Sequence, residues 1–195
     1  MDWPGQKSEN WILRQSDFTS NLPSTMDNLA FDRKRAALFV VAGGVVAGTL
    51  DITYACVFWA IKAGVPAQRI FQSVARGLLG AAAFRGGATT AVLGLFLHYF
   101  IATTMAVTYY FAAREWAVLH RRPLACGAVY GLCLYVVMTY VVVPLSAAGG
   151  GGGAQDRLWV ALSIAVHMFL IGVPIAFFAR RAMGTLPPPA LAQEV

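Results

Sequence analysis

The stretch from Ala88 to Ala113 contains no Asp, Glu, Lys or Arg, and an arginine stands beyond each end, at Arg85 and Arg114. The stretch is longer than the roughly 20 apolar residues that a helix needs to cross a bilayer. Basic residues at the ends of an apolar run are typical of transmembrane segments. The stretch therefore predicts a membrane-spanning helix with one titratable side chain, His98, near its middle.

The composition extends this prediction to the whole chain. Of the 195 residues, 58% are hydrophobic and 12% are charged, whereas soluble domains carry about 25% charged residues. Three further apolar runs have transmembrane length: Ala36–Ile61, Pro123–Leu145 and Leu158–Ala179. We therefore expect an all-α fold, a transmembrane helical bundle of four spans.

The segment Pro66–Arg76, between spans one and two, has two faces. Its polar residues recur at helical spacing, and its apolar residues lie between them; the polar set is Gln68, Arg69, Gln72, Ser73 and Arg76. This pattern predicts an amphipathic helix that lies in the membrane interface.

The domain organisation follows from these spans. Residues 1–30 are polar and are predicted to form a disordered cytoplasmic tail, and the Pro-rich residues 183–195 a second disordered tail, on either side of a transmembrane domain at 31–182. Four spans place both termini on one side. Ten basic residues fall on that side and five on the other, so the distribution of Lys and Arg favours cytoplasmic termini.

Several glycines fall inside the spans at spacings that let two helices approach closely. Gly44 and Gly48 form one GxxxG pair in span one, Gly127 and Gly131 form another in span three, and Gly94 lies one turn before His98. Such positions are typical of helix–helix contacts in membranes. They suit a homo-oligomer and packing within one chain equally.

Three titratable residues lie inside the predicted spans: Asp51, His98 and His167. Each is about ten residues from a span end that faces the same side, which at 1.5 Å per residue is roughly 15 Å below a common surface. Ionisable residues at such depth are functional-site candidates by default. We therefore predict an intramembrane polar site made of these three residues.

Three interpretations of this site are open. In the first, Asp51 shares a hydrogen bond with one histidine, preferably His98, and fixes helix packing. In the second, the layer forms a proton-linked or ion-linked path, because histidine titrates near cellular pH. In the third, two histidines and a carboxylate bind a metal, although no HxxxH, ExxH or HExxH spacing supports this.

The sequence favours a non-enzymatic protein over an enzyme, and we expect no cofactor. There is no GxSxG nucleophile motif, and the glycine run Gly149–Gly153 is not followed by the GK[ST] of a phosphate loop. The leading hypothesis is a non-enzymatic membrane component. The alternatives are a small proton- or ion-linked transporter or channel, and a membrane-embedded metal-dependent or lipid-modifying enzyme.

The net charge of +6 bears on the partners. We do not expect nucleic acid, because the basic residues cluster at span ends rather than on one polar face. Membrane lipids are the expected partners, including anionic headgroups that contact basic residues at the membrane surface.

Five stretches carry a resemblance to known proteins: GTLDITYA, QSVARGLLGAAAFRGG, LGLFLHYFIATTMAVTYYFAAR, GAVYGLCLYVVM and VVVPLS. The region from about Gly48 to Ser146 that contains them resembles small bacterial four-span integral membrane proteins of unknown function. It is more distantly similar to YagU-like inner-membrane proteins, with a histidine in the second span and Pro-Leu closing the third. The resemblance implies a bacterial inner-membrane location and brings no activity with it.

Overall fold

The computed structural model describes the backbone of residues 6–149 and 156–184, and side chains from Phe31 onward. The described residues form helices and no β-strand. Four helical stretches are long and apolar enough to cross a membrane: Phe31–Ala63, Gly87–Glu115, Pro123–Leu145 and Arg157–Met183. The all-helical architecture with four candidate spans is therefore confirmed, with ends within a few residues of those predicted.

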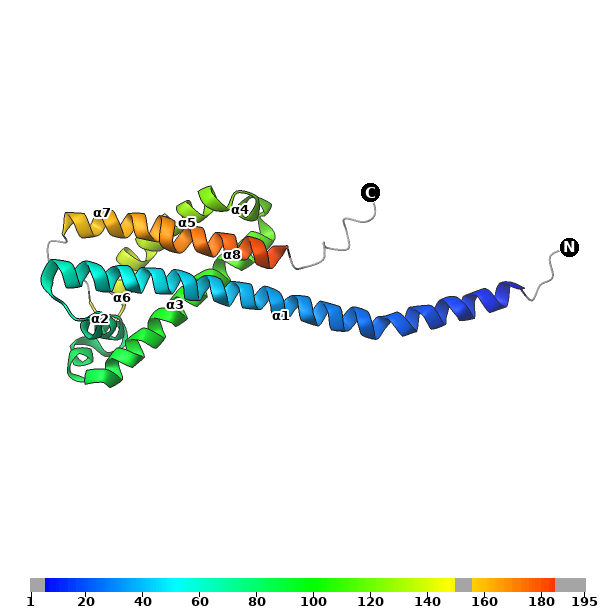
Figure 1. The fold of residues 1–195 in the computed structure, drawn as a ribbon, viewed down its shortest axis with the longest axis horizontal. Coiled ribbons are helices and arrows are strands. Elements are labelled where there is room, and N and C mark those ends of the chain that lie inside the picture. Colours follow the sequence, from blue (N-terminus) through cyan, green and yellow to red (C-terminus); the bar gives the residue numbers. More distant parts are fainter. Residues whose placement is uncertain (1–5, 150–155, 185–195) are drawn as a thin grey trace.

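The first span belongs to a long helix, α1 (Gln6–Ala63), which extends beyond the rest of the bundle (Figure 1). It ends where Gly64 adopts a positive φ of 63°, a conformation that glycine adopts without strain. The backbone of the predicted tail, residues 1–30, is thus helical from Gln6 on, while its side chains lie outside the described residues. Its assignment as a disordered cytoplasmic tail stays a prediction, and the predicted tail at 183–195 lies almost wholly outside the described residues.

A short helix and a tight turn connect spans one and two. Helix α2 (Ala67–Leu79) is followed by the 3-10 helix η1 (Gly80–Arg85) and then by α3 (Gly87–Glu115), the second span. Helix α2 sits at the end of the bundle where α1 ends and α3 begins (Figure 1). One residue of its predicted polar face, Gln72, is buried instead, and donates from Nε2 to the carbonyl of Gly87 at 2.9 Å.

The last two spans are each interrupted by a π-helical turn. After α4 (Ala117–Arg121), span three comprises α5 (Pro123–Val137), η2 (Met138–Val142) and α6 (Val143–Leu145). Span four comprises α7 (Arg157–Val166), η3 (His167–Gly172) and α8 (Val173–Met183).

Each π-helical turn ends two residues before a proline, at Pro144 and Pro174. Proline lacks a backbone N–H and clashes with the preceding turn, and a local π adjustment provides other partners for the freed carbonyl groups. The helical path therefore continues through both prolines, in α6 and α8.

The glycines of span one and Gly94 bring neighbouring backbones together. A Cβ atom on Gly94 would lie 1.8 Å from the Phe71 carbonyl oxygen of α2, and one on Gly44 would lie 2.6 Å from Cα of Thr103 in α3. Because real Cβ atoms never approach this closely, no larger residue fits there without displacing backbone. Helix α3 is thus held tightly between α1 and α2.

The second GxxxG pair serves the contact between α5 and span four. A Cβ on Gly131 would lie 2.0 Å from the His167 carbonyl oxygen, and one on Gly127 would lie 2.7 Å from that of Gly172. Both GxxxG pairs therefore face helices of the same chain.

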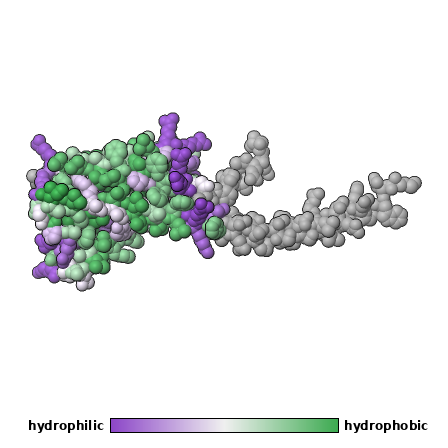
Figure 2. Space-filling view, viewed as in Figure 1, coloured by the Kyte–Doolittle hydropathy of each residue, from purple (hydrophilic) through white to green (hydrophobic). Residues whose placement is uncertain are grey.

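The packed core lies toward the end of the bundle away from α2. It is rich in alanine, which allows close helix contact; its members include Ala36, Ala106, Ala113, Ala176 and Ala179. The outer surface is the reverse of that of a soluble protein. Figure 2 shows hydrophobic residues along the flank of the bundle and hydrophilic residues gathered at its two ends. This distribution suits a protein whose flank contacts lipid.

Candidate functional site

The half of the bundle nearest α2 contains a cavity of about 510 Å³. Its walls come from α1, α2, α3, η2 and the α7–η3 helix, and its deeper residues include Ala47, Met105 and Ile171. Asp51, His98 and His167 all line it. The structure therefore brings the three titratable residues singled out by sequence to one cavity from three different spans.

His98 attaches α3 to α1. Its Nε2 atom lies 2.8 Å from the carbonyl oxygen of Gly48, so the imidazole donates this N–H to the backbone. Helices α1 and α3 lie close together at Gly48, because a Cβ there would lie 3.1 Å from Cβ of Ala102 and 3.2 Å from Cδ1 of Tyr99. In neutral His98 the other ring nitrogen, Nδ1, then carries a lone pair.

His167 is held within its own helix. Its Nδ1 donates to the carbonyl oxygen of Ser163, one turn earlier, at 2.8 Å. The ring of Tyr135 contacts the imidazole edge to face, with centroids 5.4 Å apart and an interplanar angle of 83°. Neutral His167 therefore keeps its Nε2 lone pair as an acceptor.

Asp51 has no hydrogen bond or ion pair with any residue that the structure describes. His167 and His98 are both near enough to interact electrostatically with its carboxyl group. The direct Asp51–His98 hydrogen bond preferred from the sequence is not formed, because the N–H of His98 that meets α1 is taken by the Gly48 carbonyl. Among the residues that the structure describes, the Asp51 carboxyl group therefore has no direct partner beside the cavity.

Two hydroxyl groups that sequence reasoning did not select lie in the same region. Ser163 lines the cavity and is 5% exposed, and its Oγ is close to the hydroxyl of Tyr54. Neither hydroxyl reaches hydrogen-bond geometry with a described residue. The sequence could have pointed to these two hydroxyl groups by their spacing, because Ser163 lies four residues before His167 and Tyr54 lies three residues after Asp51.

The outer end of the cavity is crossed by contacts between α2 and the turn after α6. The N–H of Ala147 donates to the carbonyl of Gly77 at 2.9 Å, and Arg76 donates from its guanidinium to the carbonyl of Ala148 at 2.6 Å. Ser73 and Gly149 are exposed lining residues at this end. The cavity therefore reaches the surface beside a strap formed by α2 and residues 146–149.

A second opening lies on the flank of the bundle. Val142 and Val143 line the cavity and yet are 38% and 41% exposed. Helices α3 and α5 meet deeper in the bundle, where the Tyr130 hydroxyl donates to the Met105 carbonyl at 2.8 Å. Toward α2, helix α3 packs against α2 rather than against η2 or α6, while α2 is tied to the turn after α6 by the Arg76–Ala148 hydrogen bond. The cavity is therefore accessible from the side that would face lipid.

An aromatic cluster joins α1 and α7 at the same end. Trp159 stacks on Tyr54, with centroids 5.4 Å apart, and contacts Phe58 at 4.9 Å. Next to this cluster, Asp156 pairs with Lys62 and accepts from the backbone N–H of Trp159 at 2.9 Å. The Lys62 ammonium, together with this cap hydrogen bond, holds the pKa of Asp156 below its usual value.

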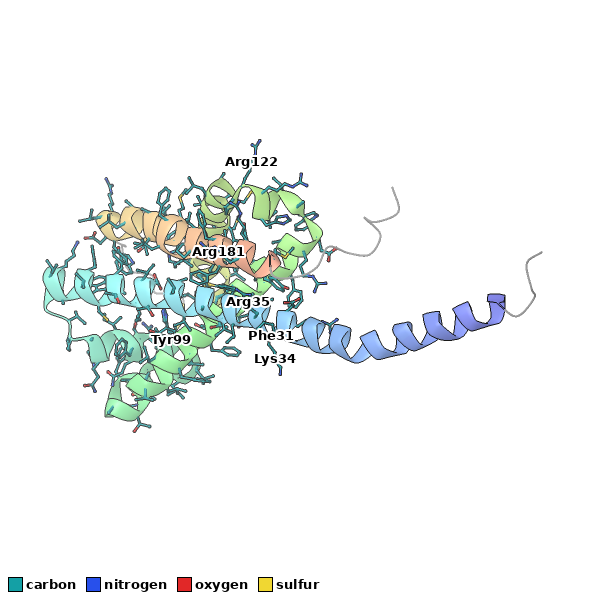
Figure 3. All side chains as sticks on the ribbon, turned by 45° about the vertical axis from the view of Figure 1, so that its right-hand side comes forward. Phe31, Lys34, Arg35, Tyr99, Arg122 and Arg181 are labelled. Carbon is teal, nitrogen blue, oxygen red and sulfur yellow. The ribbon has the colours of Figure 1, made fainter. Side chains whose placement is uncertain are left out.

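The opposite end of the bundle carries a second cavity, of about 550 Å³, lined by Arg35, Arg180 and Arg181 together with Phe39 and Phe177. Figure 3 shows Arg35 and Arg181, with Lys34 and Arg122, toward this end. Three guanidinium groups therefore lie around one cavity, and the two phenylalanines make part of its lining apolar.

The residues available for chemistry are limited. Among the described residues, no three His, Cys, Asp or Glu side chains come close enough to hold a metal ion. The described cysteines, Cys56, Cys126 and Cys133, are unpaired thiols, and none lines the polar cavity. The site can bind through charge, hydrogen bonds and apolar contact.

Comparisons of the chain with protein-family models, with curated proteins and with solved structures found no match.

Proposed function

We propose that this chain is an integral membrane protein that acts as a non-enzymatic membrane component, binding a small molecule in its polar cavity. The observation that carries the proposal is the convergence of Asp51, His98 and His167 on a cavity of about 510 Å³. That volume lies within the range of about 300–1,000 Å³ typical of ligand sites. Two openings, at the strap and on the flank, give a ligand access.

The polar groups of the cavity support binding. An ionisable side chain inside a membrane span is costly unless it is paired, yet Asp51 has no hydrogen bond or ion pair with a described residue. A bound molecule that pairs with this carboxyl group lowers the cost. If the cavity had no ligand and served only helix packing, nothing would offset the cost of the unpaired carboxyl group.

Access to the cavity is tested by thiol labelling. Cys56, Cys126 and Cys133 are first replaced by alanine, and Ser163→Cys is then compared with Ala176→Cys, which lies in the packed half and is fully buried. We expect a small methanethiosulfonate reagent to modify the cavity cysteine much faster. Equal protection of both cysteines in the folded protein would contradict the proposal.

A proton-linked transporter is the second candidate. The specific observation in its favour is that the cavity extends from one end of the bundle to the titratable groups inside the spans, while the alanine-rich core closes the other half. Transport requires that this core open. Proton flux into proteoliposomes that is lost in Asp51→Asn would favour this candidate over a binding component.

The orientation and location belong to the same proposal. Both termini lie in the cytoplasm, α2 lies in the membrane interface at the opposite face, and the membrane is the bacterial inner membrane. The distribution of basic residues supports the orientation, and the place of α2 at the end of the bundle supports its interfacial role (Figure 1). A reporter that is active only outside the cytoplasm, fused after Val195, is expected to be silent.

The proposed partners are lipids with anionic headgroups. The cavity lined by Arg35, Arg180 and Arg181 supports this assignment, because it lies at the end of the spans, where headgroups are found. Self-association has no equivalent support, since both GxxxG pairs already contact helices of the same chain.

A further inference from the structure

We propose that the polar cavity binds a lipophilic organic cation, such as a hydrophobic amine, whose charged group pairs with Asp51. This inference rests on the proposed function and specifies the class of ligand. It depends on three features of the cavity: the charge of its inner groups, the apolar character of its walls, and its opening on the flank.

The inner part of the cavity is rich in acceptors. Asp51 is the one carboxylate that the structure places on its lining, and it has no ion-pair partner among the described residues. His98 and His167 have each given one N–H to a backbone carbonyl, so that their remaining nitrogens accept in the neutral form. A ligand that carries positive charge complements this set, because a carboxylate inside a membrane span is stabilised by a paired cation.

The basic residue on the lining does not occupy this position. Arg76 belongs to α2, at the outer end of the cavity, where its guanidinium donates to the Ala148 carbonyl. It forms no ion pair with Asp51. The carboxylate therefore stays available to a ligand, while Arg76 holds the strap.

The walls of the cavity around these groups suit a ligand with a large apolar part. Ile101, Met105, Met138 and Val142 line the side between α3 and η2, and Trp159 lines the outer end. Methionine adapts to ligands of different shape, and Trp159 adds aromatic surface at the outer end. An organic cation with a hydrophobic body can pair with Asp51 and also contact the apolar walls. A small hydrated ion makes no favourable contact with these walls.

The flank opening identifies the route. Val142 and Val143 are at once part of the lining and part of the surface that would contact lipid. A molecule dissolved in the bilayer interface can enter there without passing the strap. This route favours amphiphilic ligands, which concentrate at the interface, over strictly water-soluble ones.

The experiment uses two probes of the same shape and opposite charge, tetraphenylphosphonium and tetraphenylborate. The purified full-length protein carries Ser163→Cys, with Cys56, Cys126 and Cys133 replaced by alanine, and the rate of its modification by methanethiosulfonate is measured. We expect tetraphenylphosphonium to protect this cysteine saturably and tetraphenylborate to leave its rate unchanged. With Asp51→Asn added, the phosphonium concentration that gives half-maximal protection should rise at least about tenfold.

Asp156→Asn is the matched control, because it also removes one carboxylate near this end of the bundle but Asp156 does not line the cavity. It should leave protection by phosphonium unchanged. A thermal melt of each variant checks that it is folded. If Asp51→Asn does not fold, Asp51→Glu should fold and retain protection, and loss of protection in folded Asp51→Glu counts against the proposal.

Two results would overturn the inference, and they differ from a failure of the proposed function. Protection by tetraphenylborate, or by both probes regardless of Asp51, would show that the cavity binds ligands but does not select cations. No protection by phosphonium, with the cysteine still reactive, would exclude this class of ligand. An unreactive cysteine at position 163 would instead contradict the proposed function itself.

Discussion

His98 donates its Nε2 proton to the backbone carbonyl of Gly48, 2.8 Å away, across the contact between α3 and α1. The accepting carbonyl lies one helical turn before Asp51. The hydrogen bond therefore fixes α3 beside the carboxylate without neutralising it. A structural role for His98 and a ligand-binding role for Asp51 are compatible, because the two side chains do not hydrogen-bond to each other.

Replacing His98 tests the first of these roles. His98→Phe removes the donor and should lower the free energy of unfolding by about 0.6 kcal/mol, the average for a hydrogen bond between membrane helices. His98→Gln keeps a donor and should lose less. Thermal melts of the detergent-solubilised variants compare the two, and equal melting temperatures for both would show that the hydrogen bond does not stabilise the fold.

Replacing Gly94 tests the packing of α2 against α3, because the α2 backbone contacts α3 at this glycine. Gly94→Ala would place a methyl group 1.8 Å from the Phe71 carbonyl oxygen, and such overpacking costs about 1–3 kcal/mol. Gly77→Ala is the control, since its nearest neighbour, Ser146, lies at 3.9 Å. Only the first variant should show a lower melting temperature and greater proteolysis between α2 and α3.

Gly131 distinguishes packing within the chain from self-association. Gly131→Ala meets the backbone of His167 at 2.0 Å, so it should lower the yield of folded protein and its melting temperature. Gly184→Ala, whose nearest atom is 3.7 Å away, should behave like the unaltered protein. If Gly131→Ala instead changed the oligomeric state with the melting temperature preserved, its face would belong to an interface between chains.

The Lys62–Asp156 pair predicts a dependence of stability on pH. Because the hydrogen bond from Lys62 lowers the pKa of folded Asp156 from its value of 3.8, the pair stabilises the protein above about pH 4. The stabilisation is lost as the pH falls through the folded pKa. Asp156→Asn should therefore reduce the melting temperature at pH 7 and reduce it less at pH 3, and an equal reduction at both pH values would contradict the assignment.

The arginine-lined cavity predicts selective lipid binding. Arg180→Gln with Arg181→Gln should reduce the number of phosphatidylglycerol molecules retained in native mass spectrometry and leave phosphatidylcholine unaffected, because only the former carries a net negative charge. Arg157→Gln, at the opposite end of the fourth span, is the matched control. Equal retention of phosphatidylglycerol by all three proteins would remove the assigned site.

The four spans were predictable because hydrocarbon imposes a length and an absence of charge that can be counted along the chain. The shared depth of Asp51, His98 and His167 followed from the rise of a helix. The partner of His98 did not follow, since a backbone carbonyl is present at every position and only the close approach at Gly48 selects one. Gln72 was also placed wrongly, because a helical pattern distinguishes two faces but does not show that a polar face covers the start of another helix.

The glycine contacts also determine how this molecule can move. Gly94 locks α2 to α3, and Gly131 with Gly172 locks α5 to the fourth span, so neither pair can slide internally without losing backbone contact. The cavity lies between these two units. A helix movement that changes its width is therefore expected to be a rigid-body rotation of one helix pair relative to the other, and the strap hydrogen bond between Arg76 and Ala148 is one of the contacts that such a rotation has to break.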